Sequence, residues 1–142
     1  MEIKETNPKD SVGIKKAPLH MVPPAVMFEI GLGLAEGARK YGSYNFRSAG
    51  VRASVYYDAL MRHMCQWWEG EDIDNDSNLS HVTKALSCLT VLRDAMMNNM
   101  WNDDRPIKHK NQEWLRENNK KMEQLLNKYP KGVDPFTELD NK

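Results

Sequence analysis

The stretch RHMCQWWEGEDIDNDSNLSH, residues 62–81, decides the fold because it joins two helical patterns through a short acidic loop. Apolar residues recur at helical spacing before the loop and again after it. Asn78 or Ser80 is suited to be the N-cap of the second helix, since a side-chain oxygen there accepts a hydrogen bond from the first turn. The stretch therefore predicts a helical hairpin, with His63 on the first helix and His81 at the start of the second.

The remaining sequence predicts more helices and no sheet. Helices are expected from Pro24 to Lys40, from an N-cap at Ser54 to Gly70, from the cap before His81 to about Asn98, and over about twenty residues ending before Pro130. Residues 1–22 suit an extended arm or an ordered loop, and residues 41–50 suit a turn. Glycines at positions 31, 33 and 37 predict close contact between the first helix and a neighbour. Because no strand-like alternation of useful length appears, we expect an all-α fold, a small bundle of about four helices.

The composition indicates a single domain without a general affinity for nucleic acid. A chain of 142 residues fits one domain, and its 20 basic and 20 acidic residues cancel. Without a basic field, no stable nucleic-acid partner is expected. Cys65 and Cys88 lie in separate helical patterns, so neither a disulfide framework nor a zinc knuckle is expected. With no signal peptide and no apolar run that could span a membrane, we expect a cytoplasmic protein with no membrane partner.

Five carboxylates crowd the end of the first helix and the loop, namely Glu69, Glu71, Asp72, Asp74 and Asp76. No lysine or arginine lies between them, so their mutual repulsion requires a positive partner. Oxygen-rich groups of this kind suit Mg²⁺, Mn²⁺ or Ca²⁺. An EF-hand is excluded, because Ser77 stands where its loop needs glycine and Thr83 where it needs glutamate. A solvated interhelical loop without a metal is the alternative.

The two histidines differ in how strongly they point to a site. His81 suits a metal or phosphate contact because it begins a helix beside the acidic loop. His63 lies about two turns before the loop, so only a tight hairpin brings it to the same acids, and a histidine on a helix is more often structural. The neighbouring apolar residues Met64, Cys65, Trp67 and Trp68 are most simply interpreted as core packing rather than as a ligand platform.

A second group of residues, EGARKYGSYNFRSAGVR at 36–52, mixes basic and aromatic side chains. Its members of interest are Arg39, Lys40, Arg47 and Arg52 among the basic residues and Tyr41, Tyr44 and Phe46 among the aromatic ones. Basic groups bind phosphates and aromatic rings stack on bases, so the mixture suits a nucleotide. A turn pinned by aromatic residues is the alternative. Lys9 in the N-terminal arm either adds a phosphate contact or keeps the arm soluble. If this group and the acidic loop converge, metal-assisted chemistry on a nucleoside polyphosphate is expected.

Three segments in order, NPKDSVGIKKAPLHMVPPA, EGARKYGSYNFR and ALMRHMCQWWEGEDIDNDSNLSHVTKAL, resemble the dATP/dGTP diphosphohydrolase N-terminal domain family of bacteriophages and prophages. The resemblance covers about residues 7–106 and leaves 107–142 as a C-terminal helix and tail of the same domain. It implies a relation to the all-α, MazG-like nucleotide pyrophosphohydrolases. These form helical oligomers and use Mg²⁺ or Mn²⁺ to cleave a nucleoside triphosphate to the monophosphate and pyrophosphate. The resemblance therefore implies a homo-oligomer, a dimer or a tetramer, in the cytoplasm of a bacterial host.

The recurrent positions of the family map onto this chain residue by residue. They are Lys40, Tyr41, Gly42, Asn45, Arg47, Arg62, His63, Gly70, Glu71, Asp74 and His81. Two positions depart from the pattern: Phe46 stands where tryptophan is expected, and Lys84 stands where a second histidine is expected, one turn after His81. A protonated lysine cannot bind a metal ion, so Lys84 puts a two-histidine version of the site in doubt and suits a phosphate instead.

These positions define the expected site. Glu71, Asp74 and His81 are predicted to bind one or two divalent ions, Mg²⁺ or Mn²⁺, and His63 is predicted as a further catalytic residue. The predicted substrate-binding residues are Lys40, Tyr41, Asn45, Arg47, Arg62 and Lys9, with Tyr41, Asn45 or Phe46 selecting the base. The rival hypothesis is a non-catalytic phage module that binds a nucleotide or a host protein. Lys84 favours this rival, because it is also what a degraded metal site would carry.

Overall fold

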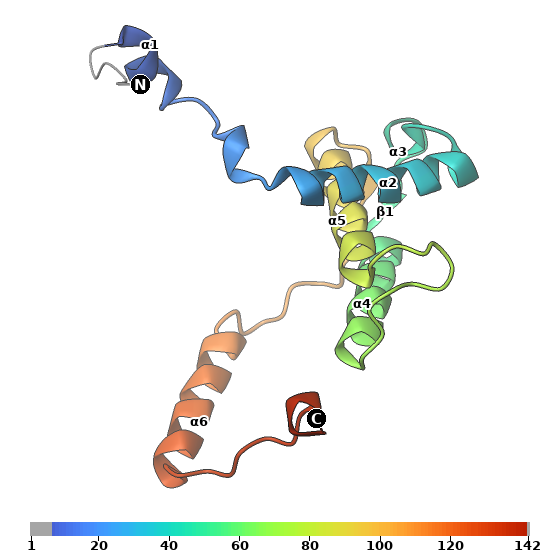
Figure 1. The fold of residues 1–142 in the computed structure, drawn as a ribbon. Coiled ribbons are helices and arrows are strands. Elements are labelled where there is room, and N and C mark those ends of the chain that lie inside the picture. Colours follow the sequence, from blue (N-terminus) through green and yellow to red (C-terminus); the bar gives the residue numbers. More distant parts are fainter. Residues whose placement is uncertain (1–6, 142) are drawn as a thin grey trace. The chain divides into compact units, whose positions relative to one another are not determined.

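The computed structural model describes residues 7–141 and divides the chain into two compact units between Arg105 and Pro106. Within the described residues there are six α-helices and two strands of two residues each (Figure 1). The predicted all-α fold is confirmed. The MazG-like relation, the single domain and the oligomer stay predictions. No helix in this part of the chain is both long and apolar enough to cross a membrane.

The first unit contains most of the regular structure. Its elements are α1 (Pro8–Gly13), the 3-10 helix η1 (Leu19–Met21), α2 (Pro24–Tyr41), α3 (Asn45–Ser48), β1 (Val51–Arg52), α4 (Ala53–Trp68), α5 (His81–Met97) and β2 (Trp101–Asn102). The helices predicted from Pro24 and before His81 are confirmed. Ser80 rather than Asn78 is the cap of α5, because its hydroxyl accepts a hydrogen bond from the Val82 backbone N–H at 3.2 Å.

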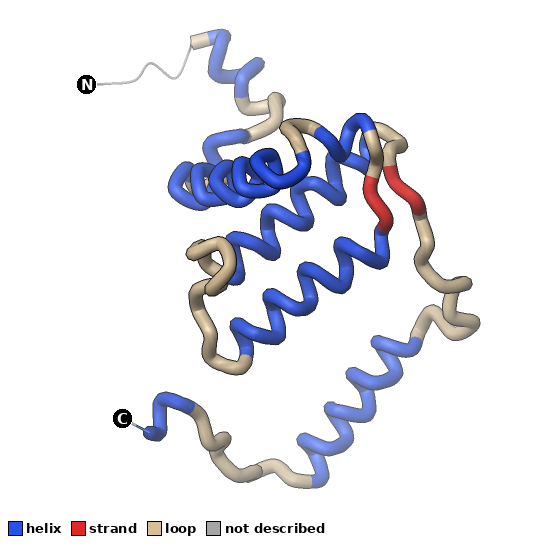
Figure 2. The backbone as a smooth tube through the Cα atoms, turned by 90° about the vertical axis from the view of Figure 1, so that its right-hand side faces the viewer, coloured by secondary structure: helices blue, strands red, loops and turns tan. Residues whose placement is uncertain are grey.

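Helix α5 lies at the centre of this unit. It runs beside α4, and α2 packs across it (Figures 1 and 2). Among the described residues, the buried apolar side chains are few and small, namely Val51, Ala53, Ala85, Val91 and Ala95. Larger apolar residues pack around them and stay partly exposed: Leu34, Phe46, Tyr56, Leu92 and Trp101. The three helices are therefore held by a narrow core that leaves room for a cavity and a polar site.

Gly33 allows α2 to approach α5 closely. A Cβ atom added at this position would lie 2.1 Å from Ser87 Oγ, which is far inside any normal contact. The same hydroxyl donates a hydrogen bond to the carbonyl of Ile30 at 3.3 Å. The close contact predicted from the glycines is thus confirmed at Gly33. At Gly31 and Gly37 an added Cβ would meet nothing within 4 Å, so packing does not require glycine there.

The N-terminus of α4 is capped from a distant part of the chain. Strands β1 and β2 pair in parallel, and the residues that follow β2 bring Asp104 to the first turn of α4. Its carboxylate accepts hydrogen bonds from the backbone N–H of Ser54, at 2.8 Å, and from the Ser54 hydroxyl. The prediction of Ser54 as the N-cap was wrong. The helix begins at Ala53 because an external carboxylate satisfies its first turn.

Two short helices lie where the sequence predicted an arm and a turn. Helix α1 begins because Asn7 accepts a hydrogen bond from the Lys9 backbone N–H at 3.0 Å, with proline in the first helical position. Helix α3 follows Tyr44, whose φ of 63° is a left-handed conformation. The predictions for these two segments were wrong in this respect. Each helix is one or two turns long and has no apolar periodicity from which to infer it.

The second unit holds α6 (Trp114–Lys128) and the 3-10 helix η2 (Glu138–Asn141). Helix α6 has 15 residues instead of about twenty, because the residues before Trp114 form a turn in which Asn111 Oδ1 accepts from the Glu113 backbone N–H at 3.0 Å. It ends where Tyr129 leaves the helical conformation just before Pro130. Its apolar side chains Leu115, Met122, Leu125 and Leu126 are each more than half exposed. The helix therefore carries an uncovered apolar face.

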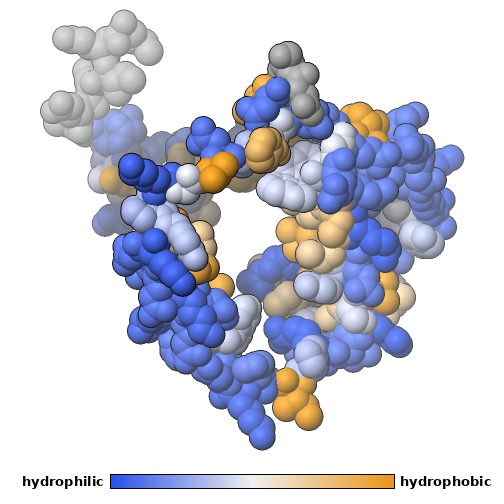
Figure 3. Space-filling view, turned by 90° about the horizontal axis from the view of Figure 1, so that it is seen from below, coloured by the Kyte–Doolittle hydropathy of each residue, from blue (hydrophilic) through white to orange (hydrophobic). Residues whose placement is uncertain are grey.

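The interpretation of the tryptophan pair as core was wrong within the first unit as the structure describes it. Trp68 is 78% exposed, Trp67 is 38% exposed, and Cys65 is also exposed. The physical reason is the offset between helices: His63 lies opposite His81, the first residue of α5, so the last turn of α4 extends beyond its neighbour. Apolar side chains, drawn in orange, are also visible at the mainly hydrophilic surface in the space-filling view of Figure 3.

Candidate functional site

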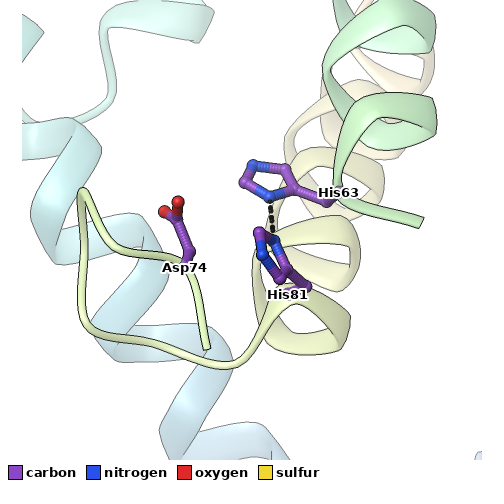
Figure 4. Close-up of side chains that lie close together, drawn as sticks. All are labelled: His63, Asp74 and His81. Atoms are coloured by element: carbon purple, nitrogen blue, oxygen red, sulfur yellow. Dashed lines mark hydrogen bonds between the residues drawn. The ribbon is translucent and has the colours of Figure 1, made fainter. Parts of the chain in front are cut away.

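Three potential metal ligands meet where the helical hairpin closes. His63 comes from α4, Asp74 from the acidic loop and His81 from the first position of α5, and one ligand atom of each lies within 4.8 Å of the others. We call these three residues the His–Asp cluster. The two imidazole Nδ1 atoms are 2.9 Å apart, and the Asp74 side chain extends from the loop beside them (Figure 4). From the sequence, we expected that only a tight hairpin would bring both histidines to the acidic loop, and the structure has such a hairpin.

Backbone hydrogen bonds fold the acidic loop back on itself and so place Asp74. The Asp74 N–H donates to the carbonyl of Leu79, and the Asn78 N–H donates to the carbonyl of Asp74, each at 2.8 Å. At the end of the loop, the His81 N–H donates to the carbonyl of Asp72 at 2.9 Å. These backbone bonds turn the loop back on itself. Side chains from other helices add contacts to it, from Lys40 to Asp76 and from Gln66 to Glu71.

The Asp74 carboxylate is kept ionised by its own loop. Burial alone would raise the pKa of this carboxyl, but hydrogen bonds from the Ser77 hydroxyl at 2.7 Å and from the backbone N–H groups of Ser77 and Asp76 outweigh it, so the pKa lies below its usual range. These donors leave other lone pairs of the carboxylate unused. Asp74 is thus a charged oxygen ligand at neutral pH.

His81 is fully buried and is oriented by Glu71. The imidazole Nε2 lies 2.7 Å from Glu71 Oε2, and the Glu71 carboxylate also accepts hydrogen bonds from the side-chain amides of Gln66 and Asn75. A carboxylate at Nε2 favours a proton on that nitrogen, which leaves the lone pair of Nδ1 facing the cluster. Glu71, predicted as a metal ligand, therefore contacts the Nε2 side of the His81 ring, while His63 lies at the Nδ1 side. The candidate metal ligand next to Nδ1 of His81 is His63 instead.

His63 completes the cluster as a neutral imidazole. Its burial, more than any nearby charge, lowers the pKa of the ring below its ordinary value, so the ring is uncharged at neutral pH and has a free lone pair. The 2.9 Å between the Nδ1 atoms is a hydrogen-bond distance, so one ring donates to the other, and both nitrogens lie where a shared ion could contact them. Two imidazoles and one carboxylate suit Mn²⁺ better than Mg²⁺, which prefers oxygen ligands and water.

Two lysines lie beside the cluster and share one carboxylate. Glu36 Oε1 accepts from Lys40 Nζ at 2.9 Å and lies 3.2 Å from Lys84 Nζ, and Lys40 Nζ also reaches Asp76 at 3.3 Å. The hydrogen bond from Lys40 lowers the pKa of Glu36 more than any other contact. Glu36 Oε2 is buried and, among the described residues, has no hydrogen-bond partner. The ammonium groups of two lysines therefore meet at Glu36, and one of them, Lys84, lies one turn of α5 after His81.

A cavity of about 140 Å³ opens on the other side of Lys84. Its walls come from α2, α4, α5 and the segment around α3, and the lining residues are Gly33, Leu34, Gly37, Ala38, Tyr41, Gly42, Tyr44, Asn45, Phe46, Tyr56, Lys84, Ser87, Cys88 and Val91. Tyr41 and Asn45, two of the predicted substrate-binding residues, are both among them. The lining is largely apolar and aromatic, as in most small-molecule sites.

The other predicted substrate-binding residues lie elsewhere. Arg47 forms a two-pronged ion pair with Asp94, at 2.9 and 2.8 Å, which ties α3 to α5 and lowers the pKa of that carboxyl. Arg62 is exposed on α4 beside His63, and Lys9 is exposed on α1. Within residues 7–141, neither lines the cavity nor belongs to the His–Asp cluster.

Sequence reasoning did not assign Glu36, Gln66, Asn75 or Ser77 to the site. One usable signal existed, because Glu36 and Lys40 stand four residues apart on a helix, a spacing at which opposite charges pair. Gln66 and Asn75 each donate one hydrogen bond to Glu71, and Ser77 donates two to Asp74. No spacing rule indicates such contacts, since they depend on how the loop folds back.

Comparisons with known proteins point to one family. The family described as dATP/dGTP diphosphohydrolase, N-terminal, matches residues 6–105, which include the cluster and the cavity. A curated relative from Salmonella phage PMBT28, named dATP/dGTP diphosphohydrolase, is 32% identical over 90 residues, covering 63% of this chain and 30% of the relative. The chain thus spans less than a third of that relative's length. No solved structure shows a significant match.

Proposed function

The chain belongs to the dATP/dGTP diphosphohydrolase N-terminal family, and on this premise we propose that it hydrolyses deoxynucleoside triphosphates, dATP or dGTP, to the monophosphate and pyrophosphate. The family and the relative's printed name support nucleotide hydrolysis. The observation that carries the proposal is the His–Asp cluster, in which His63, Asp74 and His81 present ligand atoms within 4.8 Å of one another. Such a donor set in a hydrolase family suits a catalytic divalent ion.

The proposed cofactor is Mn²⁺, with Mg²⁺ as the weaker fit. When bound, such an ion offsets phosphate charge and lowers the pKa of a water molecule. Asp74 provides the ionised oxygen ligand, and His63 and His81 provide neutral nitrogen ligands. Glu71 holds the Nε2 proton of His81 and thereby keeps the Nδ1 lone pair directed at the cluster. In this assignment Glu71 is a positioning residue for His81.

Lys40 and Lys84 are the proposed contacts for the triphosphate. Each ammonium is held by Glu36, so each can exchange a carboxylate oxygen for a phosphate oxygen without losing a charged partner. A cation at this place offsets the charge that develops on the leaving pyrophosphate. Arg62, exposed next to His63, and Lys9 remain proposed further phosphate contacts. Arg47 is left out, because Asp94 already occupies its guanidinium.

Product analysis tests the proposal. The protein is incubated with each common deoxynucleoside triphosphate and Mn²⁺ or Mg²⁺, and the products are separated by chromatography. We expect dATP or dGTP to give monophosphate and pyrophosphate. Asp74→Asn should abolish turnover, because an amide is a poor metal ligand. Asp72→Asn is the matched control: it removes the same charge from the same loop outside the cluster and should keep activity.

A non-catalytic nucleotide-binding or host-protein-binding module is the second candidate. The observation that favours it is the relative's length, since the printed activity belongs to a protein of which this chain matches 30%. Intact triphosphates with either metal, together with nucleotide binding that weakens with salt but not with metal removal, would support this candidate. Hydrolysis lost in Asp74→Asn and kept in Asp72→Asn would exclude it.

A further inference from the structure

We infer that the cavity beside α2, α4 and α5 receives the purine base of the substrate, and that Gly37 sets the space available to it. The inference rests on the proposed function, which supplies the nucleotide. It assigns that nucleotide a second binding region, because the cavity shares no lining residue with the His–Asp cluster.

The lining of the cavity suits a flat ring with a polar edge. Tyr41, Tyr44, Phe46 and Tyr56 supply aromatic side chains on several sides, and such side chains stack on bases of any sequence. Asn45 contributes an amide, which both donates and accepts hydrogen bonds, as the edge of a base requires. A largely apolar cavity with a few polar groups is the usual composition of a small-molecule site.

The order of residues along α5 relates the cavity to the cluster. His81, Lys84 and Cys88 follow one another at successive turns, which places Cys88 about 10 Å along the axis from His81. Lys84 lines the cavity and is also held by Glu36 beside the cluster. The His–Asp cluster, the Lys84 ammonium group and the largely apolar cavity thus follow one another along α5. A nucleoside triphosphate presents metal-binding phosphates, further phosphate charge and a base in the same order.

Gly37 is the lining residue whose identity protein packing does not explain. A Cβ atom there would meet no protein atom within 4 Å, although the residue borders the cavity. Glycine within a helix is less stable than alanine, so its presence has a cost that packing does not offset. Because Gly37 borders the cavity, the absence of a side chain there leaves space for a ligand. Gly31, on the same helix, has equally open surroundings but does not line the cavity, which makes it a matched control.

Binding measurements on two variants test the inference. The probes are the α,β-methylene analogue of dATP, which is not cleaved between those phosphates, and inorganic triphosphate, which has no base. Both are titrated with Mn²⁺ present in a calorimeter. Gly37→Leu should weaken binding of the analogue by at least about tenfold and leave inorganic triphosphate and Mn²⁺ unaffected. Gly31→Leu should change none of the three. Gly37→Ala adds only an unopposed Cβ and should give a smaller loss, should the leucine variant fail to fold.

The outcomes separate this inference from the function on which it rests. Unchanged affinity for the analogue in Gly37→Leu, or equal weakening of the analogue and of inorganic triphosphate, would overturn the inference. Base-dependent binding that Gly37→Leu removes, in a protein that leaves dATP intact, would support the cavity assignment and refute the proposed hydrolysis. Hydrolysis of dATP with no effect of Gly37→Leu would refute the cavity assignment alone.

Discussion

At the scale of single residues, the hydrogen bond between Glu71 and His81 decides which imidazole nitrogen faces the His–Asp cluster. Glu71 Oε2 lies 2.7 Å from Nε2, and the Nδ1 atom on the other side of the ring lies 2.9 Å from Nδ1 of His63. A neutral imidazole has one proton, so fixing it at Nε2 leaves the ligand lone pair at Nδ1. The carboxylate therefore contributes to the site without touching the metal position.

This arrangement makes opposite predictions for two substitutions of Glu71. Glu71→Gln keeps an oxygen that accepts from Nε2, so Mn²⁺ affinity should stay close to that of the parent protein. Glu71→Ala removes the acceptor and should lower the affinity by about 10–100-fold. Asp72→Ala serves as the control for lost loop charge. Metal titration followed by electron paramagnetic resonance measures all three, and a large loss in Glu71→Gln would show that Glu71 binds the ion directly.

The sequence indicated which residues lie together in this cluster better than it indicated their hydrogen-bond partners. Asp74 and His81 were expected from the acidic loop and the helix start, and the structure brings them together with His63. The contact of Glu71 with Nε2 of His81 could not be predicted, because it depends on the backbone hydrogen bonds that turn the loop back between Asp72 and Leu79. Sequence spacing gives the neighbours on one helix but not the fold of a loop.

At the scale of elements, the crossing of α2 over α5 places the cavity and the lysines. The crossing is close because Gly33 faces Ser87, and it brings Glu36 to Lys84. The helix start at Pro24, which has a strong local signal, was predicted correctly, and the cap of α5 is Ser80, one of the two residues that the sequence offered. The start of α4 was not predicted correctly, since Asp104 reaches it from fifty residues away in the sequence and no local pattern indicates that.

Substitution of Gly33 should measure how tightly these helices pack. In Gly33→Ala the new methyl group would collide with Ser87 Oγ, and rotating that hydroxyl away would lose its bond to Ile30 and still leave Ser87 Cβ at 3.0 Å. We expect the free energy of unfolding to fall by about 1–3 kcal/mol. Gly31→Ala has open space and should raise it by about 0.5–1 kcal/mol. Urea denaturation checks both, and equal effects of the two substitutions would contradict the close packing.

At the scale of the whole molecule, the exposed end of α4 leaves large apolar side chains without cover. Trp68 is 78% exposed, and Trp67 and Met61 are each exposed by more than a third. The tryptophans were interpreted as core because their type favours burial, and the first unit by itself does not bury them. We propose that a second copy of the chain covers this end of α4, since apolar patches of this kind mark protein interfaces.

Replacing Trp68 tests that proposal. Trp68→Lys should convert a dimer or larger assembly into a monomer at micromolar concentration, because a charge would have to be buried in the interface. Phe136→Lys is the control, since it changes an aromatic residue that is 95% exposed in the other unit. Light scattering after size-exclusion chromatography gives the mass. A parent protein that is already monomeric would contradict the proposal.

The most direct test of the central claim is a Mn²⁺ titration of the purified protein and of Asp74→Asn, His81→Ala and Asp72→Asn. The account predicts one tightly bound ion per chain in the parent protein and in Asp72→Asn, and strongly reduced binding in the two cluster variants. Binding that is absent from the parent protein, or unchanged in Asp74→Asn and His81→Ala, would contradict the assignment of His63, Asp74 and His81 as a metal centre.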